Sequence, residues 1–394
     1  MVNERLDLLR DYPFRRLSAL LADLNPPARE EEIIMSIGEP QHPYPAFVDR
    51  VLAENSGLWG KYPPTLGTRE LRVSISDWLH RRYGLTSIQI DPDKNVLPVA
   101  GTREALFSVA LMATPQGLNR PRRAILMPDP FYQIYSGAAV MAGAEPVYLP
   151  TSEDTGFLPD LSGLSQETLQ RTTLAYVCSP SNPQGAAATP EQFSQYIEMA
   201  RKHDFVLVVD ECYSEIYFGK PLPGVLTACD RLGGLTKNVL TFHSLSKRSN
   251  VPGLRSGFVA GDHQLIKSFG RLRQYTGNAS PGPVLAVAAA LWKDESHVEV
   301  NRRLYREKFD DAEILLGEHP CFYKPEGGFY LWLKVGDGEA VTQTLWKEAG
   351  VKVMPGKFLS TENGDAPGAG YIRVALVHSR KKTAEGLRRI AALL

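Results

Sequence analysis

Short apolar runs alternate with helix-like segments from about residue 95 to residue 262, and this alternation constrains the fold more than any other feature. The runs lie at residues 96–100, 124–127, 174–178, 205–210, 239–242 and 256–260. They are almost continuously apolar, as parallel strands covered on both faces are. The expected helices between them include residues 102–113, 131–142 and 190–203. This order predicts an α/β fold with a mainly parallel sheet and helices on both faces.

A different pattern begins near residue 290. Residues 295–316 are expected to form one long charged helix, and residues 371–377 a strand, which indicates an α+β unit. The start of the chain is too short to fold alone and is expected to pack against this unit. We therefore predict a large domain at residues 46–289 and a small domain built from residues 1–45 and 290–394.

Charge and composition argue against several classes of partner. The chain has 44 Lys and Arg and 44 Asp and Glu residues, so bulk charge favours neither nucleic acid nor an anionic membrane. No apolar run approaches the roughly 18 residues that span a bilayer. The chain also starts without an apolar signal segment, so a cytoplasmic protein is expected. The cysteines lack metal-ligand spacing, so no metal site is expected; they are Cys178, Cys212, Cys229 and Cys321.

The segment from Ser244 to Arg255 places Lys247 directly after an apolar run, among residues that favour a turn. A lysine at the mouth of a buried strand is partly desolvated, which lowers its pKa and makes the amine a usable nucleophile. Ser244 and Arg255 are donors suited to a phosphate. A reactive amine beside a phosphate clamp suggests a Schiff base to pyridoxal 5′-phosphate. The alternative for this segment alone is a basic interdomain loop.

Polar residues after other strands should converge on Lys247, because ligands of a doubly wound sheet sit outside the carboxyl ends of its strands. Gly101, Thr102 and Arg103 open a helix whose backbone N–H groups can receive a phosphate, although many helices begin this way. Asn182 could donate to a phenolate oxygen or belong to an ordinary Asn-Pro turn.

Four more residues have both a structural and a chemical interpretation. Asp210 ends a very apolar strand, so its carboxylate needs a partner, which is either an internal cation or a protonated pyridine nitrogen. Tyr213 could hydrogen-bond the phenolic oxygen of such a ring. Tyr132 could cover the ring face or be a core aromatic. Arg373, within an apolar strand, is either paired internally or binds a substrate carboxylate.

Taken together, these residues give the chain a resemblance to the fold type I pyridoxal-phosphate aminotransferases of class I and II, from Tyr12 to Arg373. The resemblance implies an α/β fold with a large domain around a mainly parallel seven-stranded sheet and a smaller α+β domain. It also implies that Lys247 is the Schiff-base lysine and the general base, and that Asp210 holds the pyridine nitrogen. The remaining ring contacts would be Tyr213 and Asn182 at the phenolic oxygen and Tyr132 as the stacking aromatic.

The resemblance also assigns phosphate and substrate contacts. The phosphate site would consist of Ser244, Arg255 and the backbone amides at Gly101, Thr102 and Arg103. Arg373 and Gly38 would bind the α-carboxylate of the amino donor and of the 2-oxo acid. Tyr62 would reach the phosphate of a neighbouring subunit, which implies a homodimer with shared active sites. The chain departs from the family pattern in having Asn-Pro-Gln-Gly, not Asn-Pro-Thr-Gly, after Ser181, and Thr102-Arg-Glu in the phosphate loop.

Within the family, several segments are similar to succinyldiaminopimelate aminotransferases. They lie at residues 130–135, 210–218, 244–262 and 301–309. This likeness implies exchange of an amino group between N-succinyl-LL-2,6-diaminopimelate and 2-oxoglutarate, in lysine and diaminopimelate biosynthesis. The succinylated end has no assigned partner, and Arg15, Arg248 and Ser249 are candidates.

Three alternatives stay open. The first is another aminotransferase, of the acetylornithine or aspartate type. The second is a C–S β-lyase, because lyases of this fold share Lys247, Asp210 and Arg373. The third is a transcriptional regulator, which would need a DNA-binding domain. Residues 1–45 show neither a helix-turn-helix pattern nor a basic cluster, which argues against this alternative.

Overall fold

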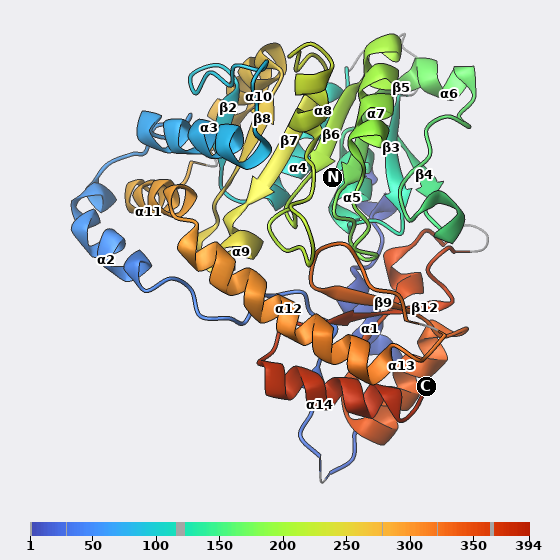
Figure 1. Cartoon of the computed structure of the whole chain (residues 1–394). Coiled ribbons are helices and arrows are strands. Elements are labelled where there is room, and N and C mark those ends of the chain that lie inside the picture. Colours follow the sequence, from blue (N-terminus) through green and yellow to red (C-terminus); the bar gives the residue numbers. More distant parts are fainter. Residues whose placement is uncertain (1, 29, 116–122, 278, 321, 363–365) are drawn as a thin grey trace.

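The computed structural model describes residues 2–28, 30–115, 123–277, 279–320, 322–362 and 366–394. Its largest sheet has seven strands in the order β2-β8-β7-β6-β5-β3-β4 (Figure 1). The bounds are β2 (Val96–Val99), β3 (Ala124–Asp129), β4 (Glu145–Pro150), β5 (Thr172–Cys178), β6 (Val206–Asp210), β7 (Val239–Ser244) and β8 (Gly257–Gly261). The prediction of an α/β fold with a mainly parallel seven-stranded sheet is confirmed.

Two strands differ from the sequence-based expectation. β8 runs antiparallel to both of its neighbours, β2 and β7, so the prediction of a parallel strand at residues 256–260 was wrong. It is fully buried like the parallel strands, and a continuous apolar run therefore does not reveal its direction. β4 was not predicted, because it lies at the sheet edge, is mostly half-buried and contains a glutamate and two prolines.

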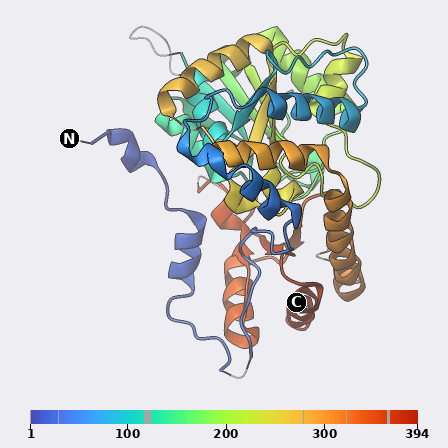
Figure 2. The ribbon, with the colours of Figure 1, turned by 90° about the vertical axis from the view of Figure 1, so that its left-hand side faces the viewer.

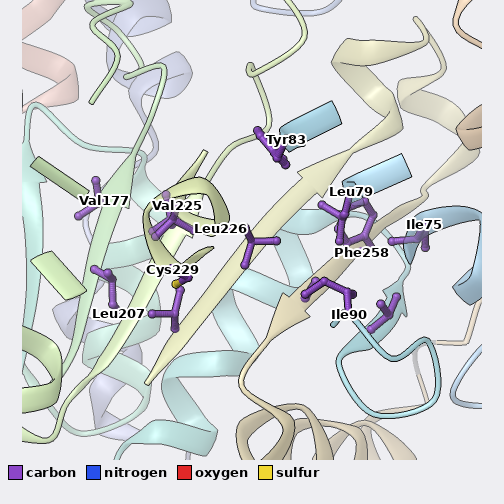
Figure 3. Packing of buried hydrophobic residues seen from close by; sticks show 14 of the residues in the cluster. Ile75, Leu79, Tyr83, Ile90, Val177, Leu207, Val225, Leu226, Cys229 and Phe258 are labelled. Atoms are coloured by element: carbon purple, nitrogen blue, oxygen red, sulfur yellow. The ribbon is translucent and has the colours of Figure 1, made fainter. Parts of the chain in front are cut away.

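Helices cover both faces of this sheet. One face packs against α3 (Arg69–Tyr83), α7 (Pro190–His203), α8 (Val225–Arg231) and α11 (Gly282–Lys293). Figure 3 shows this core, with side chains of β5, β6 and β8 among those of α3 and α8. The other face packs against α4 (Thr102–Ala113), α5 (Gln133–Met141) and α10 (His263–Thr276). Successive strand residues alternate between the two cores, which explains why the strands are apolar throughout.

The remaining elements form a smaller body below this sheet in Figure 1. It contains an antiparallel sheet in the order β11-β12-β9 and a parallel pair, β1 with β10. The strands are β1 (Ile33–Ile34), β9 (Tyr330–Lys334), β10 (Val351–Lys352), β11 (Met354–Pro355) and β12 (Tyr371–Ala375). The helices are α1 (Pro13–Leu20), α12 (Ser296–Leu316), α13 (Gly338–Ala349) and α14 (Arg380–Ala391). The β1–β10 pair joins the start of the chain to its C-terminal part. The domain boundaries at residues 45/46 and 289/290 remain a prediction.

Shorter segments complete the chain. They are α2 (Phe47–Glu54), α6 (Gln166–Arg171), α9 (Leu245–Arg248) and the 3-10 turns Glu4–Leu8, Ser56–Gly60, Glu153–Thr155, Pro252–Leu254 and Gly356–Leu359. Figures 1 and 2 show α12 starting close to the seven-stranded sheet and continuing down along the smaller body.

The described part of the chain contains neither a candidate membrane span nor a metal-ligating cluster. None of its helices is both long and apolar enough to cross a membrane. No group of three or more His, Cys, Asp or Glu side chains that could hold a metal ion occurs within the same residues. Cys321 lies outside the described residues.

Candidate active site

A cavity of about 580 Å³ opens at the edge of the seven-stranded sheet where the parallel strands end. Asp210 and Ser244 are the last residues of β6 and β7, and Asn182 follows β5. Because β8 is antiparallel, Arg255, which precedes it, lies at the same edge. Of the residues predicted to hold the cofactor or the α-carboxylate, all but Gly101 and Tyr62 line this cavity. Those that line it are Gly38, Thr102, Arg103, Tyr132, Asn182, Asp210, Tyr213, Ser244, Lys247, Arg255 and Arg373.

Lys247 projects from the short helix α9 into the cavity. Its Nζ donates a hydrogen bond to the carbonyl oxygen of Gly38 at 2.6 Å and lies 5.0 Å from the centre of the Phe329 ring. Burial lowers the pKa of Lys247 to about 8, against the opposing charge of Glu39. About a tenth of this amine is therefore neutral at pH 7, and a neutral amine is the nucleophilic form.

Asp210 is a buried carboxylate with two donors. The Tyr135 hydroxyl donates to Oδ2 at 2.7 Å, and the backbone N–H of Cys212 donates to Oδ1 at 3.1 Å. Burial raises the pKa of Asp210, and the hydrogen bonds from Cys212 and Tyr135 oppose that shift. No described Lys or Arg lies within ion-pair distance of Asp210, so a protonated ring nitrogen in the cavity would be the cation that this carboxylate lacks.

Arg373 lies on β12 with its guanidinium 4.3 Å from the centre of the Tyr330 ring. It donates to Oδ1 of Asn182 at 3.1 Å and to the carbonyl oxygen of Ser36 at 2.9 Å. It is 5% exposed, and within the described ranges no carboxylate pairs with it. The internally paired alternative is therefore not observed among these residues, and the site suits a carboxylate from a ligand.

Two polar side chains lie beside Arg373. The amide oxygen of Asn182 accepts from Arg373, which leaves its NH₂ group as a donor for an oxygen in the cavity. The hydroxyl of Tyr213 is 3.4 Å from that of Tyr330, and burial raises the pKa of Tyr213. Tyr213 therefore stays protonated and can donate as well.

A third group of residues forms an anion site. Helix α4 begins after Gly101 without a side-chain cap, so its first N–H groups are available to an anion. Gly101 has a φ of +90°, and a Cβ there would clash with Nη2 of Arg255. Only glycine leaves room for this guanidinium, which also donates to the carbonyl oxygen of Pro252 at 2.8 Å. Ser244 caps α9 at the same edge, accepting from the N–H of Ser246 at 3.1 Å.

Sequence reasoning missed two features of the cavity. The side chain of Arg103 donates to the hydroxyls of Tyr132 at 2.7 Å and Tyr12 at 3.3 Å, whereas only its backbone amide was considered. Tyr135, the donor to Asp210, was not singled out. It follows Tyr132 by three residues on a predicted helix, so the two tyrosines share a face, and that spacing was the available signal.

The candidates for the distal end of the substrate need correction. Arg248 is 1% exposed, packs against Trp292 and pairs with Glu295 at 2.6 Å. The hydroxyl of Ser249 is 2.8 Å from Nε2 of His297. Neither residue lines the cavity, so both are ruled out as direct contacts.

Two other predicted residues lie on the surface. The Arg15 side chain is largely exposed and pairs with Asp11 at 3.3 Å. Tyr62 is fully exposed and lies outside the cavity. Contact of Tyr62 with the phosphate site of a neighbouring subunit therefore remains a prediction.

Comparison with known proteins identifies the family. The profile of "Aminotransferase class I and II" matches residues 30–390. An LL-diaminopimelate aminotransferase from Syntrophobacter fumaroxidans is 31% identical over 405 residues, covering 99% of this chain and 98% of that protein. The chain belongs to the class I and II aminotransferases, which depend on pyridoxal phosphate.

Solved structures agree with this assignment. An aminotransferase from Neisseria meningitidis superposes with a TM-score of 0.94 at 41% identity, covering 100% of both chains. A probable N-succinyldiaminopimelate aminotransferase from Thermus thermophilus has a TM-score of 0.84 at 25% identity, covering 97% of this chain and 100% of that one. The family predicted from the sequence is thus confirmed, as are its fold and its cofactor.

The cavity fits pyridoxal phosphate on three observations. The amine of Lys247 has a lowered pKa, as attack on an aldehyde requires. Asp210 is buried without a described Lys or Arg partner, as a residue that pairs with a ring nitrogen would be. The uncapped start of α4 and the Arg255 guanidinium, which Gly101 admits, form a cradle for a phosphate.

Proposed function

We propose that this aminotransferase exchanges the amino group of N-succinyl-LL-2,6-diaminopimelate with 2-oxoglutarate, in the cytoplasm and as part of lysine and diaminopimelate biosynthesis. The names of the relatives from Syntrophobacter fumaroxidans and Thermus thermophilus support a diaminopimelate substrate. The likeness of residues 244–262 and 301–309 to succinyldiaminopimelate aminotransferases favours the succinylated form.

The observation that carries the choice of substrate is the side chain of Arg103. It lines the cavity and is exposed, and it donates hydrogen bonds to the hydroxyls of Tyr132 and Tyr12. No described carboxylate lies within ion-pair distance of it. The distal end of the succinylated donor carries two carboxylates and no ammonium, whereas that of LL-diaminopimelate carries one carboxylate beside an ammonium. A guanidinium free to bind a carboxylate therefore favours the succinylated donor.

The residues of the chain divide the work in this proposal. Bound pyridoxal phosphate supplies an electron sink for the electron pair of the substrate Cα–H bond. Arg373 and Gly38 hold the α-carboxylate, which places the Cα hydrogen near Lys247. The amine of Lys247 would take the proton from Cα and deliver it to the cofactor, and a pKa of about 8 suits both transfers. Asp210 keeps a proton at the ring nitrogen.

Two side chains act on the phenolic oxygen of the ring in the same proposal. Tyr213 and the NH₂ group of Asn182 donate hydrogen bonds to this oxygen and stabilise its negative charge. Both line the cavity. Because Asn182 also accepts from Arg373 at 3.1 Å, binding of a substrate carboxylate and orientation of the ring are linked through one side chain.

The direct test is a set of initial rates with 2-oxoglutarate as acceptor. We expect the highest kcat/KM with N-succinyl-LL-2,6-diaminopimelate, compared with LL-diaminopimelate, N-acetylornithine and aspartate. We also expect no pyruvate from cystathionine in the absence of a 2-oxo acid. Loss of a charge-assisted hydrogen bond costs about 1.5–3 kcal/mol, so Arg103→Gln should raise KM for the succinylated donor about tenfold to a hundredfold.

LL-diaminopimelate is the second candidate donor, and one observation favours it. The exposed carboxylate of Glu39 lines the same cavity and could bind the distal ammonium group that this substrate retains. Glu39→Gln is therefore the matched variant for Arg103→Gln. The proposal of a succinylated substrate would be contradicted if the wild type had its higher kcat/KM with LL-diaminopimelate. In that case the preference should be lost in Glu39→Gln and kept in Arg103→Gln.

We propose further that two copies form a homodimer with shared active sites, in which Tyr62 reaches the phosphate of the neighbouring subunit. The large exposed side chains of Trp59 and Tyr62 support this, because such residues usually mark a contact surface. Light scattering should give the mass of a dimer, and Tyr62→Phe should weaken binding of pyridoxal phosphate. A monomer with full activity would refute the shared site.

A further inference from the structure

A chain of hydrogen bonds joins the backbone at Lys247 to helix α12. The side-chain NH₂ group of Asn301 donates to the carbonyl oxygens of Lys247 at 3.1 Å and Arg248 at 3.4 Å. Its amide oxygen lies 2.8 Å from Nδ1 of His42 and accepts from Asn250 at 3.0 Å. Asn301 is 3% exposed, so these contacts lie in the interior.

Lys308 extends this chain to both segments that carry the proposed carboxylate contacts. Its Nζ is 2.7 Å from Nε2 of His42 and donates to the carbonyl oxygen of Leu376 at 2.9 Å. His42 lies four residues after Gly38, and Leu376 lies three residues after Arg373. The side-chain nitrogen of Lys308 therefore bridges the Gly38 segment and the Arg373 segment.

The bridging residues share one face of α12. Asn301, Tyr305 and Lys308 are spaced by four and three residues, which places them on one side of the helix. Lys308 is 1% exposed, and no described carboxylate lies within ion-pair distance of it. A buried lysine without a carboxylate is costly, and an apolar side chain would pack there at lower cost.

The direction of each hydrogen bond follows from the partners. The NH₂ group of Asn301 faces two carbonyl oxygens, so its amide oxygen must accept and Nδ1 of His42 must donate. Nε2 of a neutral His42 is then the acceptor for Lys308. Burial and the nearby Lys308 lower the pKa of His42 to about 4, in agreement with a neutral ring.

We propose that Lys308 and His42 are positioning residues that hold the Gly38 and Arg373 segments in register with the amine of Lys247. The inference rests on the roles proposed above for Gly38, Arg373 and Lys247, and it does not depend on which amino donor is natural. The segment at residues 301–309 then also sets the geometry of carboxylate binding.

Three variants separate this role from simple packing. Lys308→Met keeps the length of the side chain and removes the donor. His42→Phe removes both ring nitrogens, whereas His42→Gln retains one donor and one acceptor. Tyr305→Phe is the matched control, because its hydroxyl is buried on the same helix face without a hydrogen-bond partner among the described residues.

The first readout is the affinity of the cofactor-loaded enzyme for glutarate, an unreactive dicarboxylate, measured from the change in cofactor absorbance. The second is kcat per bound cofactor, and the third is the melting temperature. Misplacement of reacting groups by about 1 Å can cost a hundredfold in rate. We therefore expect Lys308→Met and His42→Phe to weaken glutarate binding at least threefold and to lower kcat about tenfold to a hundredfold. Tyr305→Phe should match the wild type, and His42→Gln should recover most of the loss.

The outcomes are distinct. Wild-type glutarate affinity and kcat in Lys308→Met would overturn the inference, even if the melting temperature fell. Equal losses in His42→Phe and His42→Gln would also overturn it, because the hydrogen bonds would then be irrelevant. If the wild type itself did not bind glutarate, the proposed role of Arg373 would fail first.

Discussion

The hydroxyl of Tyr135 offers a sharp test of how Asp210 is kept ionised. Tyr135→Phe removes the 2.7 Å hydrogen bond to Oδ2 and leaves the carboxylate of Asp210 with the hydrogen bond from the backbone N–H of Cys212. A hydrogen bond to a charged group contributes about 1.5–3 kcal/mol. Since 1.36 kcal/mol corresponds to tenfold in rate, kcat/KM should fall about tenfold to a hundredfold if Asp210 must stay charged.

Tyr176→Phe is the matched control for this variant. The Tyr176 ring stacks on that of Tyr135 with centroids 4.4 Å apart, but its hydroxyl donates to the carbonyl oxygen of Leu106. Both variants lose one buried hydrogen bond, so both should lower stability by about 1 kcal/mol. Initial rates and thermal unfolding of the two proteins provide the comparison. Equal kcat/KM in Tyr135→Phe and Tyr176→Phe would refute the reasoning.

Three further predictions concern the carboxylate site, the phosphate site and the amine. Arg373→Lys should raise KM for both amino donor and 2-oxo acid about tenfold in steady-state assays, because one point charge replaces a bidentate donor. An effect on one substrate alone would contradict this role of Arg373. Gly101→Ala should weaken binding of pyridoxal phosphate in equilibrium titrations by displacing Arg255, whereas Gly84→Ala, also at positive φ but with open space, should affect only stability. Because burial lowers the pKa of Lys247, the neutral amine appears at lower pH, so attachment of the cofactor to the apoprotein should accelerate with a midpoint near pH 8. A midpoint above about 10, the ordinary range of lysine, would exclude the buried environment.

The placement of the site at the strand ends could be predicted from the sequence. Asp210, Ser244 and Asn182 each end or follow a continuous apolar run, and parallel strands bring such positions to one edge. The start of α7 could also be predicted, since Thr189 and Gln192 are spaced as in a capping box and form one in the structure. These features depend on local sequence, which is why a single chain suffices to find them.

Features that depend on tertiary packing could not be predicted. The direction of β8 is not encoded in its burial, because a strand covered on both faces is apolar in either orientation. Arg248 follows Lys247 directly, yet it turns into the core between Trp78 and Trp292, which lie far away in sequence. Contacts of Lys308 with His42 join residues 266 positions apart, and no local pattern indicates such a pairing.

The central claim is that Lys247 is the residue that binds the cofactor, and borohydride reduction followed by peptide mass mapping tests it most directly. Lys308 is another buried lysine, and burial lowers its pKa to about 7. The experiment therefore has to distinguish between two lysines whose amines are partly neutral. We predict that reduction fixes one pyridoxyl group on Lys247, and that Lys247→Ala loses both the adduct and turnover. An adduct on Lys308 or any other lysine, or full activity in Lys247→Ala, would contradict the account.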